Sequence, residues 1–269
     1  MKLIDAHCHL QDSRIIAEHA RLVQRANSGG IKYMVCCATC AKDWSDVQKL
    51  SLEHNSIIPG YGIHPWFVDN LSSTWKEKLI NLLESEKTRL EFHSTPGIGE
   101  AGLDFTIKGC DRDLQKDILV QQLELAKEMN LPISIHIRKA WDMFIHIIKK
   151  IGKLDAQGLI HSYSGSPDMV PLFEKYGFYI SFSGSITRPG AKKVARSLGS
   201  VSKHRMLVET DSPDICPTRQ SNQEENNINT PENLVIIAKA ASQIKKITIK
   251  ECAMTTYNNG VRLFNISEK

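Results

Sequence analysis

The sequence lacks any long apolar run. None of its apolar segments approaches the ~18 consecutive residues that a membrane-spanning helix needs. Its first ten residues, MKLIDAHCHL, contain no cationic segment followed by an apolar stretch of signal-peptide length. No glycine-rich phosphate loop follows the first apolar segment, and we find neither an internal repeat nor a low-complexity segment. We therefore expect a soluble globular protein with no membrane segment, and a nucleotide-binding doubly wound sheet is disfavoured.

The cysteines do not form the pattern of a disulfide framework or of a zinc ribbon. There are seven, an odd number, and Cys37 and Cys40 form a single C-x-x-C. A zinc ribbon needs a second pair of this kind, so these two are expected to be thiols at the end of a strand. Because nothing in the sequence suggests export, reduced thiols predict a cytoplasmic or nuclear location.

The composition is that of an ordinary globular chain. The sequence has 269 residues, of which 41% are hydrophobic and 24% charged, enough for one large domain or two small ones. The formal net charge is +4, and the pI is about 8.6. This balance is compatible with binding a polyanion but does not require it. The lysine and arginine clusters at 149–153 and 192–196 have helical spacing and are expected on solvated helix faces.

Short apolar runs alternate along the chain with longer segments of helical period. The runs expected to form buried strands are Leu3–Ala6, Tyr33–Ala38, Ile57–Tyr61, Pro96–Gly99, Ile133–Ile135, Leu159–Ile160, Phe178–Phe182 and Met206–Val208. Strands that alternate with helices imply a parallel sheet with crossover connections. Their number and the chain length predict one α/β domain over residues 1–269, a (β/α)8 TIM barrel, regular or distorted. A doubly wound open sheet is the alternative.

Two helix boundaries can be predicted from capping residues. The amphipathic segment from Asp111 to Met129 should end where Asn130 can cap it and a proline follows. A second helix should begin at Thr230 and Pro231. The polar segment before it, Ser212–Asn229, is longer than a simple connector, so we expect it to lie beside the active site and select substrate.

The first apolar run ends in three potential metal ligands, in the motif DAHCHL. Side chains alternate faces along a strand, so His7 and His9 should point together into the barrel. Cys8 should point outward, toward the helices, as a packing residue. Two imidazoles on one face are either a pair of metal ligands or two hydrogen-bonded core histidines.

Further runs also end in polar side chains of ligand type. They are His64 after the third run, Glu100 and Asp104 after the fourth, His136 and Arg138 after the fifth, His161 after the sixth, and Glu209 and Asp211 after the eighth. In a barrel these strand ends face one mouth, where active sites of this architecture lie. The pattern therefore predicts a metal site at the C-terminal mouth. The histidines without such a setting, expected on the surface or in helices, are His19, His54, His93, His146 and His204.

Taken together, these motifs resemble the TatD-type deoxyribonuclease family of metal-dependent hydrolases. The blocks DAHCHL, GIHPW, GEAGLDF, HIRKA, HSYSGS, ETDSP, NTPENL and NNGVRLF match the family in order, from residue 5 to residue 264. The departures, at Ala101, Ser162 and Tyr163, remove no ligand. The resemblance implies a metal-dependent TIM-barrel nuclease with two metal ions. It implies that His7, His9, Glu100 and Asp211 hold one ion, and that Glu100, His136 and His161 hold the other.

The chemistry of phosphodiester hydrolysis agrees with this resemblance. Two cations can neutralise the anionic phosphate and hold the attacking and leaving oxygens, and a glutamate can bridge them. Glu100 and Asp211 are the predicted catalytic residues, Glu100 as the bridge and Asp211 as the acceptor of a proton from water. His64 and Arg138 are predicted to bind phosphate oxygens of the substrate. Asp104 and Glu209 are predicted to orient ligating imidazoles, with loop capping as their alternative role.

The leading functional prediction is a deoxyribonuclease that uses two divalent metal ions, Mg, Mn or Zn. It would remove nucleotides from DNA ends or single strands, as a 3′–5′ exonuclease. A hydrolase of another ester or amide, such as an aminoacyl-tRNA deacylase, is a second possibility because the same ligands would serve it. A non-catalytic nucleic-acid-binding protein is the third class.

Overall fold

The computed structural model describes residues 1–91, 93–218 and 228–267, and its centre is a barrel of eight parallel strands. Neighbouring strands are hydrogen-bonded in the order β1-β2-β3-β4-β5-β6-β7-β8. Their bounds are β1 Leu3–Cys8, β2 Ile31–Cys37, β3 Ile57–Tyr61, β4 Gly97–Asp104, β5 Ile133–Arg138, β6 Gly158–Ile160, β7 Phe178–Phe182 and β8 Met206–Val208. The predicted (β/α)8 architecture is confirmed. The strands β1, β4 and β5 run further toward the mouth than expected, because their polar ends continue the sheet.

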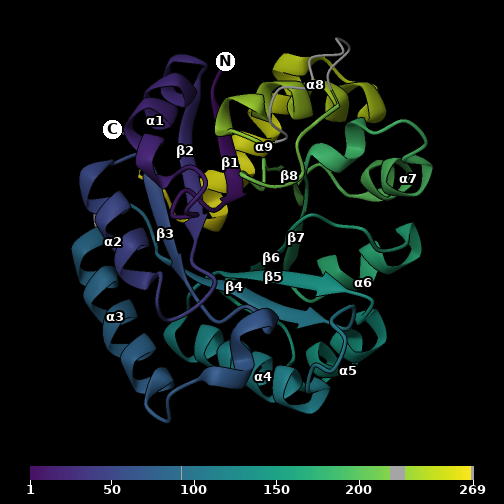
Figure 1. Ribbon diagram of the computed structural model, residues 1–269. Helices are drawn as coiled ribbons and strands as arrows, with labels where there is room; N and C mark the ends of the chain where they lie inside the picture. The colour runs from purple at the N-terminus through teal and green to yellow at the C-terminus, as the bar shows by residue number, and fades with distance from the viewer. Residues whose placement is uncertain (92, 219–227, 268–269) are drawn as a thin grey trace.

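Helices surround the strands, and α1 to α8 follow one another around the barrel (Figure 1). The α-helices are α1 His19–Ser28, α2 Trp44–Glu53, α3 Trp75–Leu90, α4 Arg112–Met129, α5 Trp141–Ile151, α6 Val170–Lys175, α7 Lys192–Ser200, α8 Leu234–Lys245 and α9 Ile249–Leu263. Short 3-10 helices are η1 Ile16–Glu18, η2 Pro65–Asn70, η3 Pro167–Met169, η4 Gly184–Thr187 and η5 Pro231–Asn233. Within the described ranges, no helix has the length and apolar character needed to cross a membrane.

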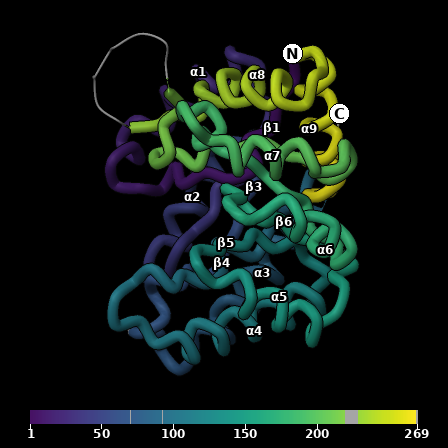
Figure 2. Tube along the Cα trace, turned by 90° about the vertical axis from the view of Figure 1, so that its right-hand side faces the viewer, coloured from purple at the N-terminus to yellow at the C-terminus, as the bar shows by residue number. Residues whose placement is uncertain are grey.

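The two predicted helix boundaries are observed. The Asp111 carboxylate accepts the N–H of Leu114 at the start of α4, and Asn130 ends this helix in the left-handed conformation. The second helix starts at Pro231 with the 3-10 turn η5 and continues as α8. Figure 2 shows α8 next to α7 on the outside of the barrel.

The polar segment before η5 is described only at its two ends. The N–H of Asn229 donates to the carbonyl of Pro213, and its side-chain amide donates to the carbonyl of Thr210. These bonds hold the two ends of the segment together beside β8. Residues 219–227 lie outside the described residues, so the expected substrate-selecting role of this segment stays a prediction.

The strands have one apolar layer outside the barrel and another inside it. The larger lies between the strands and the helices. The smaller contains side chains at alternate strand positions that face the barrel axis, together with side chains from α9 and the residues after it: Ile4, Ala6, Val35, Cys37, Ile58, Leu159, Tyr179, Leu207, Tyr257, Leu263, Phe264 and Ile266. These residues fill the barrel along its axis. The buried polar side chains gather at the C-terminal ends of the strands.

The barrel closes between β8 and β1 through the chain that follows β8. The N–H of Asp211 donates to the carbonyl of His7 (3.0 Å), and the N–H of His9 donates to the carbonyl of Ser212 (2.8 Å). The Asp5 carboxylate adds a side-chain link, since it accepts the N–H of Thr210 (2.8 Å). This seam places the histidines at the end of β1 against Asp211, which lies some 200 residues later in the chain.

Candidate metal centre

A local irregularity in β1 aims its histidines at the mouth. Ile4 and Ala6 face the barrel interior, so strict alternation would send Cys8 inward as well. However, the pairing of β1 with β2 shifts register between Asp5 and Cys8. Cys8 consequently packs in the outer layer, where its thiol donates to the carbonyl of Val35 (3.4 Å). The predicted outward orientation of Cys8 is confirmed, although simple alternation holds over only part of the strand.

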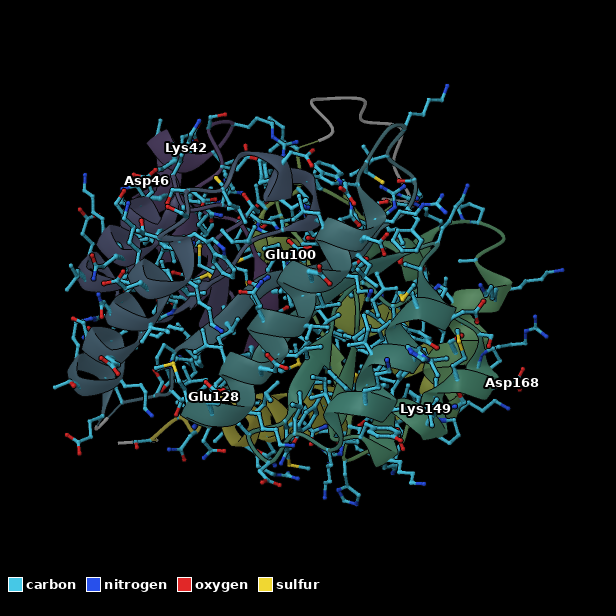
Figure 3. All side chains as sticks on the ribbon, turned by 90° about the horizontal axis from the view of Figure 1, so that it is seen from below. Lys42, Asp46, Glu100, Glu128, Lys149 and Asp168 are labelled. Atoms are coloured by element: carbon cyan, nitrogen blue, oxygen red, sulfur yellow. The ribbon has the colours of Figure 1, made fainter. Side chains whose placement is uncertain are left out.

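Glu100, on β4, lies at the centre of the site, with its two carboxylate oxygens facing different pairs of histidines. Its Oε2 atom lies 3.4 Å from His7 Nε2 and 3.2 Å from His9 Nε2. Its Oε1 atom lies 2.9 Å from His136 Nδ1 and 2.7 Å from His161 Nε2. Glu100 is 3% exposed, and Figure 3 shows it near the middle of the molecule, inside the other labelled residues. The side chain is therefore shared by two groups of potential ligands.

Asp211 completes the group on the Oε2 side. Its Oδ1 atom lies 3.5 Å from His9 Nε2 and 4.0 Å from His7 Nε2. These three residues each offer a ligand atom within 4.8 Å of the others, a spacing that one metal ion can fill. Burial alone would raise the pKa of the Asp211 carboxyl, but the hydrogen bond with His9 and the neighbouring imidazole charges lower it to about 2. Asp211 is thus ionised at neutral pH.

The hydrogen bonds of His9 show that a cation fits between these groups. Its Nδ1 atom lies 2.8 Å from the carbonyl of Cys37, which can only accept, so Nδ1 carries the hydrogen. In the neutral ring, Nε2 then points a lone pair at the carboxylates of Glu100 and Asp211. Burial alone would lower the pKa of His9, but these two carboxylates raise it well above its ordinary value. A proton or a metal ion at Nε2 satisfies all three groups.

Carboxylates lie behind the histidines on the Oε1 side. Asp104 Oδ2 is 3.4 Å from His136 Nε2, and Glu209 Oε1 is 3.5 Å from His161 Nδ1. Among the described residues, His161 Nδ1 and Glu209 Oε2 are buried without a hydrogen-bond partner. A carboxylate behind an imidazole orients the ring and raises its basicity as a metal ligand. Asp104 and Glu209 thus lie next to these two imidazoles, and their orienting role stays a prediction.

The two residues predicted to bind substrate occupy different environments. His64 is buried, its Nε2 lies 3.5 Å from Glu100 Oε1, and its Nδ1 accepts the N–H of Trp66. Burial lowers the pKa of His64 to about 3, so its ring is neutral. Because Nδ1 accepts the N–H of Trp66, Nε2 carries the hydrogen and is the donor. Together with Glu100 and His136 it forms another group with metal-ligand spacing. The side chain of Arg138 is 54% exposed at the rim, 3.7 Å from Asp104.

The remaining histidines lie outside this cluster. His93, His146 and His204 are exposed, as expected. His19 and His54 are half-buried and contact each other (Nδ1 to Nε2, 3.0 Å). This pair joins the start of α1 to the end of α2, 35 residues apart in the sequence, and no local pattern indicated it.

Sequence reasoning missed three side chains that support the cluster. The indole N–H of Trp66 donates to Asp104 Oδ2 (2.9 Å), and Ser134 Oγ lies 2.8 Å from His7 Nδ1. Gln115, from α4, accepts the backbone N–H of Asp104 (2.9 Å). Only Trp66 had a detectable signal, since it stands in the GIHPW block.

A TIM barrel with this cluster at its C-terminal mouth has the architecture of a metal-dependent hydrolase. Comparison with known families identifies the class more closely. The model of the family described as TatD related DNase matches residues 4–265, nearly the whole sequence. The chain belongs to this family of metal-dependent hydrolases.

Individual relatives extend the similarity over nearly their whole length. The chain is 30% identical to an uncharacterized metal-dependent hydrolase, YabD of Bacillus subtilis, over 98% of this chain and 100% of that protein. It is also 30% identical to the human deoxyribonuclease TATDN3, over 97% of this chain and 94% of the relative. Among solved structures, YjjV, a TatD homolog from Escherichia coli, superposes with a TM-score of 0.89 at 27% identity, and the alignment covers 98% of both chains.

Proposed function

We propose that this metal-dependent hydrolase is a deoxyribonuclease that uses two divalent metal ions bridged by Glu100. The observation that carries the proposal is the division of its carboxylate, with Oε2 facing His7 and His9 and Oε1 facing His136 and His161. With a single ion, one of these imidazole pairs would face the carboxylate through protons alone. The human relative named as a deoxyribonuclease supports the choice of DNA as substrate.

The side chains have distinct tasks in this scheme. Two bound divalent ions would neutralise the charge of the scissile phosphodiester and lower the pKa of an attacking water. The ionised Asp211 accepts the proton of that water. The neutral ring of His64 donates a hydrogen bond to a phosphate oxygen of the substrate. The guanidinium of Arg138 binds a phosphate oxygen at the rim. Asp104 and Glu209 keep the imidazoles of His136 and His161 oriented.

The proposal also specifies the metal and the direction in which the DNA strand is digested. A mixed set of imidazole and carboxylate ligands suits Zn or Mn, and Mg is the third candidate. We assign 3′–5′ removal of nucleotides from DNA ends or single strands. Because all seven cysteines are free thiols, the proposed location is a reducing compartment, the cytosol or the nucleus.

End-labelled DNA cleavage tests this function. Single-stranded DNA labelled at the 5′ end should give a ladder that shortens one nucleotide at a time with at least one of Mg, Mn or Zn. DNA blocked at its 3′ end should resist. An aminoacyl ester is assayed in parallel, because ester cleavage without DNA cleavage would establish the deacylase alternative instead. Binding of DNA without cleavage of either substrate, at full metal occupancy, would leave only the nucleic-acid-binding alternative.

A further inference from the structure

Two adjacent aromatic side chains are exposed beside the metal centre. Trp66 is 55% exposed and Phe67 is 41% exposed. The other large apolar side chains that are exposed in the described part of the chain, namely Met1, Leu52, Ile228 and Met254, are all aliphatic. Single exposed apolar residues are common on protein surfaces and need no explanation. Two consecutive aromatic residues, both exposed and both within ring-contact distance of a histidine at the mouth of the barrel, are a more specific arrangement.

Both rings are attached to the site itself. They lie in η2, directly after His64, whose ring centroid is 5.0 Å from that of Trp66 and 6.4 Å from that of Phe67. His64 in turn lies 3.5 Å from Glu100. The side chain of His64 therefore contacts the aromatic pair on one side and lies near Glu100, a proposed metal ligand, on the other.

The indole of Trp66 is held in an unusual orientation. Its polar N–H points inward and donates to Asp104 Oδ2 (2.9 Å), although the residue as a whole is 55% exposed. Solvation alone would favour the opposite arrangement, with the N–H in water and the ring covered. The hydrogen bond fixes the ring, so a flat ligand that stacks on it loses little additional conformational entropy.

A cation stands on the same rim. The Arg138 guanidinium lies 3.7 Å from the carboxylate of Asp104 that accepts the Trp66 N–H, and its side chain is 54% exposed. A fixed aromatic face next to an accessible guanidinium matches a ligand that joins a flat ring to a phosphate. In a nucleic acid, an unpaired nucleotide has this chemistry, since its base can stack while its phosphate is neutralised.

We propose that Trp66 and Phe67 form a stacking platform for an unpaired nucleobase next to the scissile phosphodiester. The inference rests on the proposed nuclease function and adds a feature that selects the substrate. Bases paired within a duplex are stacked on their neighbours and cannot reach the platform. The pair would thus favour unpaired ends, while the metal centre itself is indifferent to the base.

Steady-state kinetics on single-stranded oligothymidylate, with and without one abasic position near the cleaved end, tests the platform. In the wild-type protein the abasic position should raise KM roughly 5- to 150-fold, the range that loss of one stacked base produces. Phe67→Ala should raise KM for intact DNA and reduce the effect of the abasic position, with a smaller change in kcat. Met254→Ala is the matched control, since Met254 is 61% exposed on α9.

The two functions of the Trp66 side chain can be separated. Trp66→Phe keeps a ring but removes the donor to Asp104, so KM should change less than in Trp66→Ala. Quenching of Trp66 fluorescence by oligothymidylate in the presence of a chelator measures binding without catalysis, and Trp66→Phe identifies the signal. Quenching without DNA cleavage would support the platform while refuting the nuclease. Cleavage with unchanged KM and an undiminished abasic effect in both alanine variants would overturn the platform alone.

Discussion

Glu100 and Glu86 are two carboxylates buried to nearly the same extent, but with opposite kinds of neighbours. Glu100 is 3% exposed and Glu86 is 0% exposed. Around Glu86, in α3, the neighbours are hydrogen-bond donors. Its Oε1 atom accepts hydrogen bonds from the Arg89 guanidinium (3.0 Å) and the Gln48 amide (3.0 Å). Its Oε2 atom accepts one from the Tyr61 hydroxyl (3.2 Å). Around Glu100 the neighbours are imidazole nitrogens, which donate only when they carry a hydrogen.

This difference separates a structural carboxylate from one suited to a metal ion. Arginine stays protonated and cannot ligate a metal, so the charge of Glu86 is compensated by the chain itself. Burial, followed by the charge of Glu86, raises the pKa of Tyr61, which keeps the hydroxyl protonated as a donor. The charge of Glu100 is matched only if protons or metal ions occupy the nitrogens that face it. Depth of burial alone would not have distinguished the two sites.

The largest effect is expected for a substitution of Glu100. Glu100→Gln keeps the shape of the side chain but removes the charge that bridges the two groups of imidazoles. Metal content should fall, and hydrolysis should drop by more than the roughly 10–100-fold seen for groups that only support ligands. Circular dichroism should show a folded barrel. A folded variant with wild-type metal content would refute the bridging role.

Glu86→Gln is the matched counterpart and should act on stability instead. It leaves the Arg89 guanidinium, 27% exposed, without its carboxylate, and we expect a loss of about 3 kcal/mol in the free energy of unfolding. Metal content and kcat should remain those of the wild type. Urea denaturation and metal analysis of the two glutamine variants, side by side, provide the comparison. A loss of metal in Glu86→Gln would show that the two carboxylates are not independent.

A smaller effect is expected for Glu209, which lies beside the proposed ligand His161. Glu209→Gln keeps an oxygen that can accept the N–H of Ser162 but removes the charge beside His161. Metal affinity should fall by about 10–100-fold, while Glu209→Ala should also lose stability because the Ser162 N–H is left unpaired. Titration with a competing chelator measures the affinity. Unchanged affinity in Glu209→Gln would reduce Glu209 to the loop-capping role.

The same comparison explains how much of the molecule the sequence could predict. The predicted members of the metal cluster lie in the carboxyl-terminal half of a strand or just after it, except Glu100, which lies near the middle of β4. Parallel strands bring these parts of the sheet together whatever the details of packing. This made the fold and the cluster around Glu100 accessible from motifs. The exact length of β4 was not, because its polar end resembles a loop.

The site of Glu86 could not be read in the same way. In sequence it is one acid among the charged residues of an amphipathic helix, and Arg89 three positions later is typical of a surface ion pair. Its other partners, Tyr61 and Gln48, come from β3 and α2. Trp66 stands in a recognisable sequence block, but its contact with Asp104 was equally hidden, since only the folded chain brings the two together. Contacts between elements, rather than patterns within them, decide such sites.

The smallest effect is expected at Cys8, which stands between two proposed ligands but, like Glu86, belongs to the structural part of the molecule. Its thiol donates to Val35 in the outer layer, so the hydroxyl of Cys8→Ser retains an acceptor and should cost only about 1 kcal/mol of stability. Metal content and activity should stay at the wild-type level, whereas His9→Ala, one position further, should lose most of both. Thermal unfolding, metal analysis and the DNA assay on these two variants test the orientation of β1. If Cys8→Ser were as inactive as His9→Ala at normal stability, Cys8 would have to face the mouth, and the shift in register between Asp5 and Cys8 could not separate the neighbouring side chains as described.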